Sequence, residues 1–497
     1  MMTLKRLRLG GAALSLYAAA GLAAAGCSGT GISNPVDAGV VADLGAPALD
    51  LTRPGPPGPS LSDISPRSVS NAGGATLTLR GQNFQAGATV TIGGAACLSP
   101  VVTGGQITCT APPRPASCGA VTVVITNPDQ QRASDSTTLA YRSSRFGFLA
   151  TNSISSNGNA SAVRAIDASG DGKVDLVAAA YASQTLTVHV GNGDGTFKSQ
   201  PILTQVGSTG SLQPAAAVLD VTGDGKPDVL SAFTVGTGNR FGLFTGVGDG
   251  TFSAPASPVD IGSIAPNSIA AGDVDGDGKP DYALALGGFL STETTVLLYR
   301  NSLVPLASAT MDSGARGVTL ADLNGDGKPD LLTASRGKGG ISVRLNGATG
   351  FGVLASFAMG TSTNALAVAD YNGDGKLDVA ACNTDANTVT VRLGDGSGGF
   401  GALFGSPVAV GSSPVSIAAT DMDGDGAVDL VVSNASSNDF HVLLGRGDGT
   451  FTPAGPFALA SGPNQITVGD FNGDRQPDVA ANSGNTNLLP VRLQQCL

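Results

Sequence analysis

Glutamate is almost missing from this sequence of 497 residues: Glu293 is the only one, and the other 37 acidic residues are aspartates. Tryptophan is absent, and charged residues make up only 13% of the chain, whereas glycine occurs 72 times. Glycine and aspartate both disfavour helix interiors, and good helix formers such as glutamate are scarce. The composition therefore excludes a mainly helical protein and predicts an all-β fold with many turns.

Groups suited to catalysis are also few. Acid–base glycosidases need two positioned carboxylates, but the chain has a single glutamate, and 23 of its 37 aspartates belong to the repeated loops described below. No Ser/His/Asp constellation is visible around the two histidines, His189 and His441, and both fall on expected strands, where packing is their expected role. We therefore expect no catalytic residues and no enzyme. A polysaccharide-degrading enzyme, a lyase or hydrolase, is the alternative.

Positive charge is in deficit, with 27 lysines and arginines and a net charge of −11. Phosphate backbones require a basic face, so nucleic acid is excluded as a partner. The surplus of aspartate favours bound cations instead.

Long apolar runs are missing apart from residues 9–25, which follow Lys5, Arg6 and Arg8. This run of 17 residues is shorter than the roughly 20 of a spanning helix, and with its basic start it indicates an export signal. Cys27 after small residues resembles the lipidated cysteine of bacterial lipoproteins, although Ala24 stands where that family usually has leucine. We expect residues 1–26 to be a lipoprotein signal peptide and Cys27 to carry a membrane anchor. An ordinary signal peptide with a chance cysteine is the alternative.

The resemblance to lipoproteins also predicts a location. Ser28 follows the cysteine where that family's retention signal has aspartate, which implies an exported protein at the outer membrane or cell surface. Residues 27–60 are rich in Gly, Ala, Asp and Pro and predict a disordered, extended tether.

Residues 61–143 change to short alternating segments at 75–81, 88–94 and 120–125, separated by turn residues. This pattern predicts a β-sandwich. The sequences at 64–66, 73–74, 79–84 and 90–94 resemble an IPT/TIG domain, which implies an immunoglobulin-like fold and a spacer or binding role. Three cysteines lie here, and Cys97–Cys109 is the favoured disulfide because both residues flank one expected hairpin. Cys118 could be free or could replace either partner, and Cys382 and Cys496 have no assigned pairing.

From residue 144 to 497 one aspartate-rich phrase returns seven times, at intervals of 48–53 residues. Each unit contains a short strand, an Asp-Gly loop, an apolar strand, a third strand and a Gly-rich turn, as at 415–419, 430–433, 441–444 and 447–451. With one more strand after the turn, each unit forms a four-stranded propeller blade. The seventh unit is one strand short, and residues 145–149 resemble the missing strand. We therefore expect a seven-bladed β-propeller closed by a blade that both ends of the repeat region share.

The repeated phrase is a nonapeptide rich in oxygen ligands. Calcium prefers six to eight oxygens in a flexible cage, and oxygens at positions 1, 3, 5 and 9 with the carbonyl at position 7 can surround one ion. Glycines at positions 4 and 6 permit the tight wrap. The phrase resembles the FG-GAP/VCBS repeat of integrin-type propellers, which implies calcium loops.

We predict up to seven structural calcium ions, with five ligand positions in each loop. Position 1 is Asp167, Asp220, Asp273, Asp322, Asp370, Asp421 and Asp470. Position 3 is Ser169, Thr222, Asp275, Asn324, Asn372, Asp423 and Asn472. Position 5 is Asp171, Asp224, Asp277, Asp326, Asp374, Asp425 and Asp474. Position 7 is Lys173, Lys226, Lys279, Lys328, Lys376, Ala427 and Gln476. Position 9 is Asp175, Asp228, Asp281, Asp330, Asp378, Asp429 and Asp478.

The seven loops differ in acidity. The loops starting at Asp273 and Asp421 have four carboxylates and should bind calcium most tightly. Ser169 and Thr222 supply only a hydroxyl at position 3, which predicts weaker sites, and Arg475 replaces the second glycine of the last loop. The sequence as a whole predicts a lipid-anchored, calcium-binding surface protein that acts as a non-catalytic module for an unidentified protein or glycan.

Overall fold

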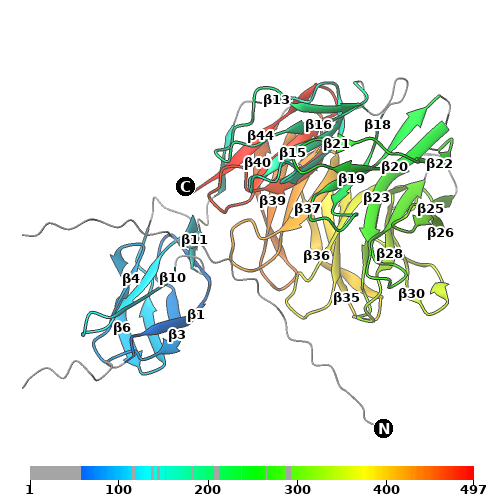
Figure 1. Cartoon of the computed structure of the whole chain (residues 1–497). Coiled ribbons are helices and arrows are strands. Elements are labelled where there is room, and N and C mark those ends of the chain that lie inside the picture. Colours follow the sequence, from blue (N-terminus) through cyan, green and yellow to red (C-terminus); the bar gives the residue numbers. More distant parts are fainter. Residues whose placement is uncertain are drawn as a thin grey trace, which may run out of the picture. The chain divides into compact units, whose positions relative to one another are not determined.

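The computed structural model describes residues 57–496, apart from 115–118, 136–138, 143–145, 151–152, 181–182, 206–211, 237, 265, 287–292 and 460. Every element of regular secondary structure found in these ranges is a β-strand (Figure 1), so the predicted all-β fold class is confirmed. Within the same ranges there is accordingly no helix that could cross a membrane. The predicted signal peptide, the lipidation site at Cys27 and Cys118 lie outside the described residues.

The first folded part is a β-sandwich. One sheet has the order β1 (Ser60–Ser65), β3 (Thr76–Gln82), β7 (Gln106–Thr110) and β6 (Leu98–Thr103). The other has the order β10 (Arg132–Asp135), β9 (Val123–Thr126), β4 (Thr89–Ile92) and β5 (Ala95–Ala96). A third, small sheet consists of β2 (Ser68–Ser70), β11 (Ala140–Arg142) and β8 (Gly119–Ala120).

The core of the sandwich comes from the alternating residues of these strands. In β3, Leu77 and Leu79 are fully buried, whereas Thr76 and Arg80 are exposed and Thr78 is half-buried. The predicted strand at 120–125 is wrong in one respect, because the chain changes sheets there. Ala120 ends β8, and Val123 starts β9 in another sheet. At this corner the Val121 N–H donates to Leu139 O.

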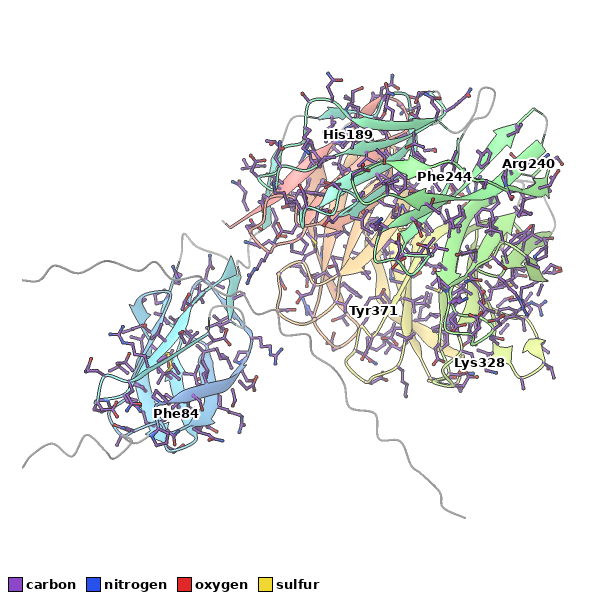
Figure 2. The ribbon with its side chains drawn as sticks, in the orientation of Figure 1. Phe84, His189, Arg240, Phe244, Lys328 and Tyr371 are labelled. Atoms are coloured by element: carbon purple, nitrogen blue, oxygen red, sulfur yellow. A yellow bond between two sulfur atoms is a disulfide. The ribbon has the colours of Figure 1, made fainter. Side chains whose placement is uncertain are left out.

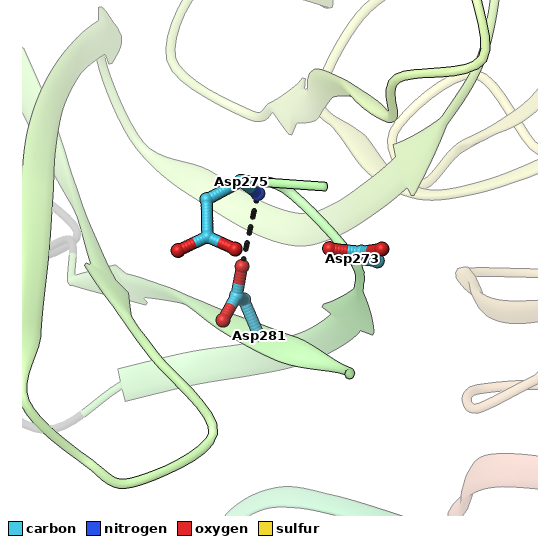
Figure 3. Close-up of side chains that lie close together, drawn as sticks. All are labelled: Asp273, Asp275 and Asp281. Atoms are coloured by element: carbon cyan, nitrogen blue, oxygen red, sulfur yellow. Dashed lines mark hydrogen bonds between the residues drawn. The ribbon is translucent and has the colours of Figure 1, made fainter. Parts of the chain in front are cut away.

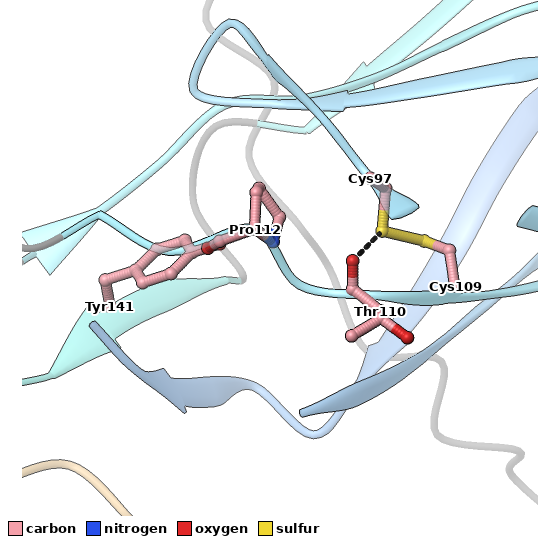
Figure 4. Close-up of a disulfide and its surroundings, with 5 residues drawn as sticks. All are labelled: Cys97, Cys109, Thr110, Pro112 and Tyr141. Carbon is pink, nitrogen blue, oxygen red and sulfur yellow. Dashed lines mark hydrogen bonds between the residues drawn. A yellow bond between two sulfur atoms is a disulfide. The ribbon is translucent and has the colours of Figure 1, made fainter. Parts of the chain in front are cut away.

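A disulfide joins Cys97 and Cys109, the pair favoured from the sequence (Figure 4). Cys97 lies just before β6 and Cys109 lies in β7, so the bond crosses one hairpin. Nearby, the buried Tyr141 hydroxyl donates to Pro112 O at 2.7 Å.

The second folded part is a propeller of seven sheets, which we number as blades 1 to 7. The innermost strands, in that order, are β14 (Ala160–Ile166), β18 (Leu212–Leu219), β23 (Pro266–Gly272), β27 (Ala315–Ala321), β33 (Thr363–Ala369), β37 (Pro414–Thr420) and β41 (Pro463–Gly469). The second strands are β15 (Asp175–Ala180), β19 (Asp228–Val235), β24 (Asp281–Leu286), β28 (Asp330–Ser335), β34 (Asp378–Asn383), β38 (Asp429–Asn434) and β42 (Asp478–Ser483).

The third strands are β16 (Thr185–His189), β20 (Gly238–Gly246), β25 (Glu293–Tyr299), β29 (Gly340–Arg344), β35 (Thr388–Gly394), β39 (Asp439–Gly445) and β44 (Val491–Cys496). The outer strands are β17 (Ile202–Gln205), β22 (Val259–Gly262), β26 (Pro305–Asp312), β32 (Ala355–Ala358), β36 (Phe400–Ala409), β40 (Phe451–Ala458) and β12 (Phe146–Ala150). Short additions are β21 (Phe252–Ser253), β13 (Ile154–Ser155) paired with β43 (Leu488–Leu489), and β30 (Asn346–Gly347) paired with β31 (Gly350–Phe351).

The blades form a closed ring. Each innermost strand contacts those of the next and the previous blade, and β14 of blade 1 contacts β41 of blade 7. Blade 7 is completed by β12, which pairs antiparallel with β44 and matches Phe148 to Gln494. The predicted seven-bladed fold, with a blade shared between distant segments, is confirmed.

The blades pack face to face through their second strands. Every residue of these strands is buried except the last two of β19, which is the expected pattern for a strand covered on both faces. Aromatic rings such as Phe244 fill the space between blades (Figure 2). The innermost strands differ, because most of their residues are half-buried and line a hollow axis.

Candidate metal centres

Each aspartate-rich loop joins the innermost strand of a blade to its second strand. We number the loops 1 to 7 with their blades. Position 1 directly follows the innermost strand, and position 9 is the first residue of the second strand in all seven blades. The repeated phrase therefore occupies an equivalent place in every blade.

The carboxylate at position 1 holds the loop in its tight curve. In loop 1, Asp167 Oδ1 accepts from the N–H of Gly170 at 2.7 Å, and Oδ2 accepts from that of Gly172 at 2.8 Å. Both glycines have positive φ, 72° and 81°, which side chains with a Cβ rarely adopt. The corresponding aspartates of loops 2 to 5 accept the same pair of bonds.

The carboxylate at position 5 turns toward the backbone in all seven loops. Its Oδ1 accepts from the N–H of position 7 at 2.8–3.0 Å. In three loops the lysine at position 7 also brings its ammonium near the other oxygen, at 3.7 Å in the pair Lys226–Asp224. Loop 6 has Ala427 at position 7 and so lacks that internal cation.

The aspartate at position 9 has a role that the sequence analysis missed. It is almost completely inaccessible to solvent in every blade. Its Oδ2 accepts from the N–H of position 2, and its Oδ1 accepts from a backbone N–H near the end of the third strand. In the sequence, position 9 lies directly before an apolar run, which predicts a buried residue and could have indicated this role.

Burial makes the negative charge at position 9 costly. It raises the pKa of Asp429 and of Asp478 to about 7, and it raises the pKa of Asp175, Asp281, Asp330 and Asp378 in the same direction. A buried carboxylate favours a nearby cation or a proton.

The structure brings three carboxylates together in the two loops with four aspartates. Oxygens of Asp273, Asp275 and Asp281 lie within 4.8 Å of one another (Figure 3), and so do those of Asp421, Asp423 and Asp429. These are positions 1, 3 and 9. The two clusters do not include the carboxylates at position 5, Asp277 and Asp425. These are the only clusters of three acidic, histidine or cysteine ligands found within the described residues.

The two clusters differ in how their charge is balanced. In loop 3, Arg300 Nε lies 3.3 Å from Asp275 Oδ2 and supplies a positive charge. In loop 6, burial and then the neighbouring charge of Asp425 raise the pKa of Asp423 to about 6. Loop 6 therefore has the stronger need for a cation.

Loop 7 keeps the common shape despite Arg475. This residue adopts the positive φ of the glycine that it replaces, 65°, and its N–H donates to Asp470 Oδ2 at 2.7 Å. Arg475 belongs to the lining of the hollow axis of the propeller, and within the described residues its side chain makes no hydrogen bond to the loop.

The residues present fit a hard divalent cation. All side-chain donors at positions 1, 3, 5 and 9 are oxygens, and most are carboxylates, which calcium prefers. In loop 6 the crowded carboxylates would be relieved by a bound positive charge. The identity of the ligand atoms stays a prediction for all seven loops.

Hydrogen bonds also join the loops to the adjacent blades, and no sequence pattern indicates these bonds. In five loops the carbonyl of position 2 accepts from the next blade. The five donor–acceptor pairs are Gly250 N to Ala168 O, Asn346 Nδ2 to Val274 O, Gly449 N to Tyr371 O, Gln494 Nε2 to Met422 O, and Gly195 N to Phe471 O. The shape of a loop is therefore coupled to the contact between blades.

Both histidines lie on third strands, as expected. His189 is 1% exposed, and neither of its ring nitrogens has a hydrogen-bond partner within the described structure (Figure 2). His441 Nδ1 lies 3.1 Å from Asn434 Nδ2 and 3.5 Å from Asp439 Oδ1. Cys382 is a free, buried thiol whose pKa is raised by burial, and the side chain of Cys496 is outside the described part.

Sequence comparisons identify both parts of the chain. An IPT/TIG domain model matches residues 59–141. An FG-GAP-like repeat model matches residues 167–231, 220–284, 322–381, 370–432 and 421–481, and these ranges contain all seven loops. No curated protein sequence matches the chain.

Several solved structures resemble the chain remotely. An auxiliary nutrient binding protein from Bacteroides ovatus has a TM-score of 0.38 at 13% identity, and the match covers 88% of this chain and 98% of that one. A second such protein, from Bacteroides thetaiotaomicron, has a TM-score of 0.40 at 12% identity with the same coverage. Hydrazine synthase from Kuenenia stuttgartiensis has a TM-score of 0.46 at 14% identity, covering 67% of this chain and 95% of that one.

The repeat matches together span more than half of the sequence, in the region where the structure forms seven similar blades. The chain therefore belongs to the FG-GAP-like repeat family and carries an IPT/TIG domain ahead of its repeats.

Proposed function

We propose that this chain is an exported, lipid-anchored surface protein whose propeller is held together by calcium and serves as a non-catalytic binding or adhesion module for protein or glycan. The ions have a structural role, with ligands at positions 1, 3, 5, 7 and 9 of each loop. The sandwich and the residues before it would present the propeller away from the membrane.

One observation carries the calcium part of this proposal. Each loop is tied to its own blade through the buried aspartate at position 9, and five loops are also tied to the next blade through position 2. A cation that fixes a loop would therefore also fix a contact between blades. At millimolar calcium and a dissociation constant of ~0.1 mM, each ion adds about 1.4 kcal/mol to the free energy of unfolding.

The experiment is thermal unfolding of the full chain in 1–2 mM calcium and in excess chelator (concentrations of the order typical for extracellular calcium modules). We expect a much lower melting temperature in chelator, because stabilisation from several sites adds together. Magnesium at equal concentration is the control and should restore little, since it demands near-ideal octahedral geometry. An equal melting temperature in calcium and in chelator would refute the structural role.

The binding part of the proposal is supported by the scaffold. Propeller loops are displayed by rigid blades, and loops on a rigid scaffold commonly carry binding function. Protein is the favoured partner over glycan, since the chain has no tryptophan and only six tyrosines to stack on sugar rings. Pull-down from cell-surface fractions and a glycan array, each with and without calcium, would separate the two partners.

The membrane anchor has its own test. Metabolic labelling with a tagged fatty acid should mark the wild-type chain, and Cys27→Ser should abolish the label, because a thiol is needed for the acyl linkage. The variant should also leave the membrane fraction. Label or membrane retention in Cys27→Ser would contradict the anchor at Cys27.

A further inference from the structure

The axis of the propeller contains a cavity of about 780 Å³. Residues from six innermost strands line it: those of blades 1, 3, 4, 5, 6 and 7. These strands carry half-buried residues, such as those of β37, because one side faces the hollow axis. The volume lies within the range of about 300–1,000 Å³ that is usual for small-molecule sites.

The lining is positively charged, although the chain as a whole is acidic. Three arginines line the cavity, Arg164, Arg316 and Arg475, together with one aspartate, Asp470. Both oxygens of Asp470 already accept backbone N–H bonds of loop 7, from Gly473 and Arg475. In a protein with net charge −11, this local surplus of positive charge favours an anionic ligand.

Arg164 is held in position by neutral oxygens. Its Nη1 donates to Gln465 Oε1 of blade 7 and to Val163 O, each at 2.8 Å, and its Nη2 donates to Ala216 O of blade 2 at 3.0 Å. A guanidinium has five N–H donors. The remaining two, Nε–H and one Nη2–H, have no partner within the described structure. Donors on these two nitrogens can make a bidentate pair with a carboxylate or phosphate.

A second guanidinium and several amides lie along the same cavity. Arg316 Nη1 is 3.4 Å from Asn267 Oδ1, and burial together with the charge of Arg336 lowers the pKa of Arg316. Amides of Asn364, Asn464 and Gln465 belong to the lining. Amide groups donate to and accept from hydroxyl groups, so they suit a polar ligand body.

We propose that this axial cavity binds a small hydroxylated anion, with the carboxylate or phosphate group held by Arg164 and with Arg316 adding positive charge. The proposal goes beyond the binding role inferred above, because it assigns a small-molecule site at the axis in addition to a macromolecular partner. The loops at the propeller surface remain free for a macromolecular partner.

The test is calorimetric titration of the calcium-loaded full chain with glucuronate, glucose 6-phosphate and glucose. We expect one saturable site for at least one of the two anions and none for glucose. Arg164→Gln should weaken anion binding by at least about 10-fold, as expected when a hydrogen bond to a charged group is lost. Arg392→Gln is the matched control, because Arg392 also donates to a carbonyl of a neighbouring segment but lies outside the cavity lining, and it should bind like wild type.

Arg164 also joins three blades, so its variants need a check of folding. Arg164→Lys keeps the charge without the paired N–H donors of the guanidinium, and Arg316→Gln leaves Arg164 intact. Both variants should weaken anion binding, and they test the proposal even if Arg164→Gln fails to fold. Absence of saturable anion binding, or equal binding by Arg164→Lys, Arg316→Gln and wild type, would overturn the proposal. The melting shift by calcium, measured on the same samples, shows separately whether the calcium scaffold holds.

Discussion

At the scale of single residues, the most informative side chains are buried polar groups without a hydrogen-bond partner to offset the free-energy cost of burial. His189 is enclosed in the blade-1 core with neither nitrogen bonded, whereas His441 has Asn434 and Asp439 beside it. Burial lowers the pKa of His189 from 6.5 to about 4. The unfolded chain therefore takes up a proton before the folded chain does, and stability at this residue is lost as pH falls from about 6.5 toward 4.

We predict that His189→Leu stabilises the propeller, by about 1 kcal/mol at pH 7.5, because a buried polar group without partners is removed. The advantage should grow by about 2–3 kcal/mol near pH 4. Only the wild-type chain loses stability there, because its unfolded state protonates His189 more readily than its folded state does. Urea unfolding of both proteins at several pH values, at fixed calcium, measures this difference. His441→Leu should destabilise instead, because it removes a bonded group. An advantage of His189→Leu that does not depend on pH would contradict the argument.

At the scale of elements, the loop is the unit in which charge repulsion and metal binding oppose each other. Loop 6 holds three carboxylates in one cluster without a lysine at position 7, while loop 5 has the neutral Asn372 at position 3. Asparagine and aspartate have nearly the same shape, so exchanging them changes the charge and leaves the loop's backbone bonds in place.

We predict that Asp423→Asn changes the free energy of unfolding with opposite signs in chelator and in calcium. In chelator it should stabilise the chain by about 1–2 kcal/mol, because a repelled, partly buried carboxylate is removed. In calcium it should destabilise, because the ion loses a charged ligand. Denaturant midpoints in both buffers, together with calcium titration, test this. Asn372→Asp in loop 5 is the reciprocal control and should reverse both signs; the same sign in both buffers for Asp423→Asn would count against a metal in loop 6.

The elements also show where sequence reasoning stopped. The position of each strand around a loop followed from apolar runs and turn residues, so the first three strands of blade 6 were predicted to within one or two residues. The sheet change between Ala120 and Val123 was missed, because an alternating run gives no sign that its two halves pair with different partners. The aspartate at position 9 also accepts a backbone hydrogen bond near the end of the third strand. This role was missed for a similar reason, since the backbone donor lies 16 residues away in most blades.

At the scale of the whole molecule, stability depends on closing the ring. Strand β12 completes blade 7, and the ring of Phe148 lies 4.9 Å from that of Phe440 and 4.8 Å from that of Phe457, centroid to centroid. An unclosed ring would expose strand edges, which invite aggregation.

We predict that Phe148→Ala destabilises the propeller by about 2–4 kcal/mol, because it removes a large ring from the closing contact. Limited proteolysis should then cut first within blade 7, and denaturant unfolding should shift to a lower midpoint. Phe404→Ala on the outer strand of blade 5 is the control; Phe404 is 38% exposed, and removal of its ring should cost less than half as much. Equal losses for the two variants would indicate that closure through β12 contributes little.

The sequence by itself determined the all-β class, the seven blades, the shared closing blade and the place of each aspartate-rich loop. It could do so because these features depend on patterns a few residues long that recur at a nearly constant interval. Tertiary structure decided which oxygens meet, which loops contact the next blade and which side chains reach the axis. Arg164 and Gln465, for example, are 301 residues apart in the chain and are joined only because the ring closes. Contacts of that kind arise from packing between blades, which no local pattern records.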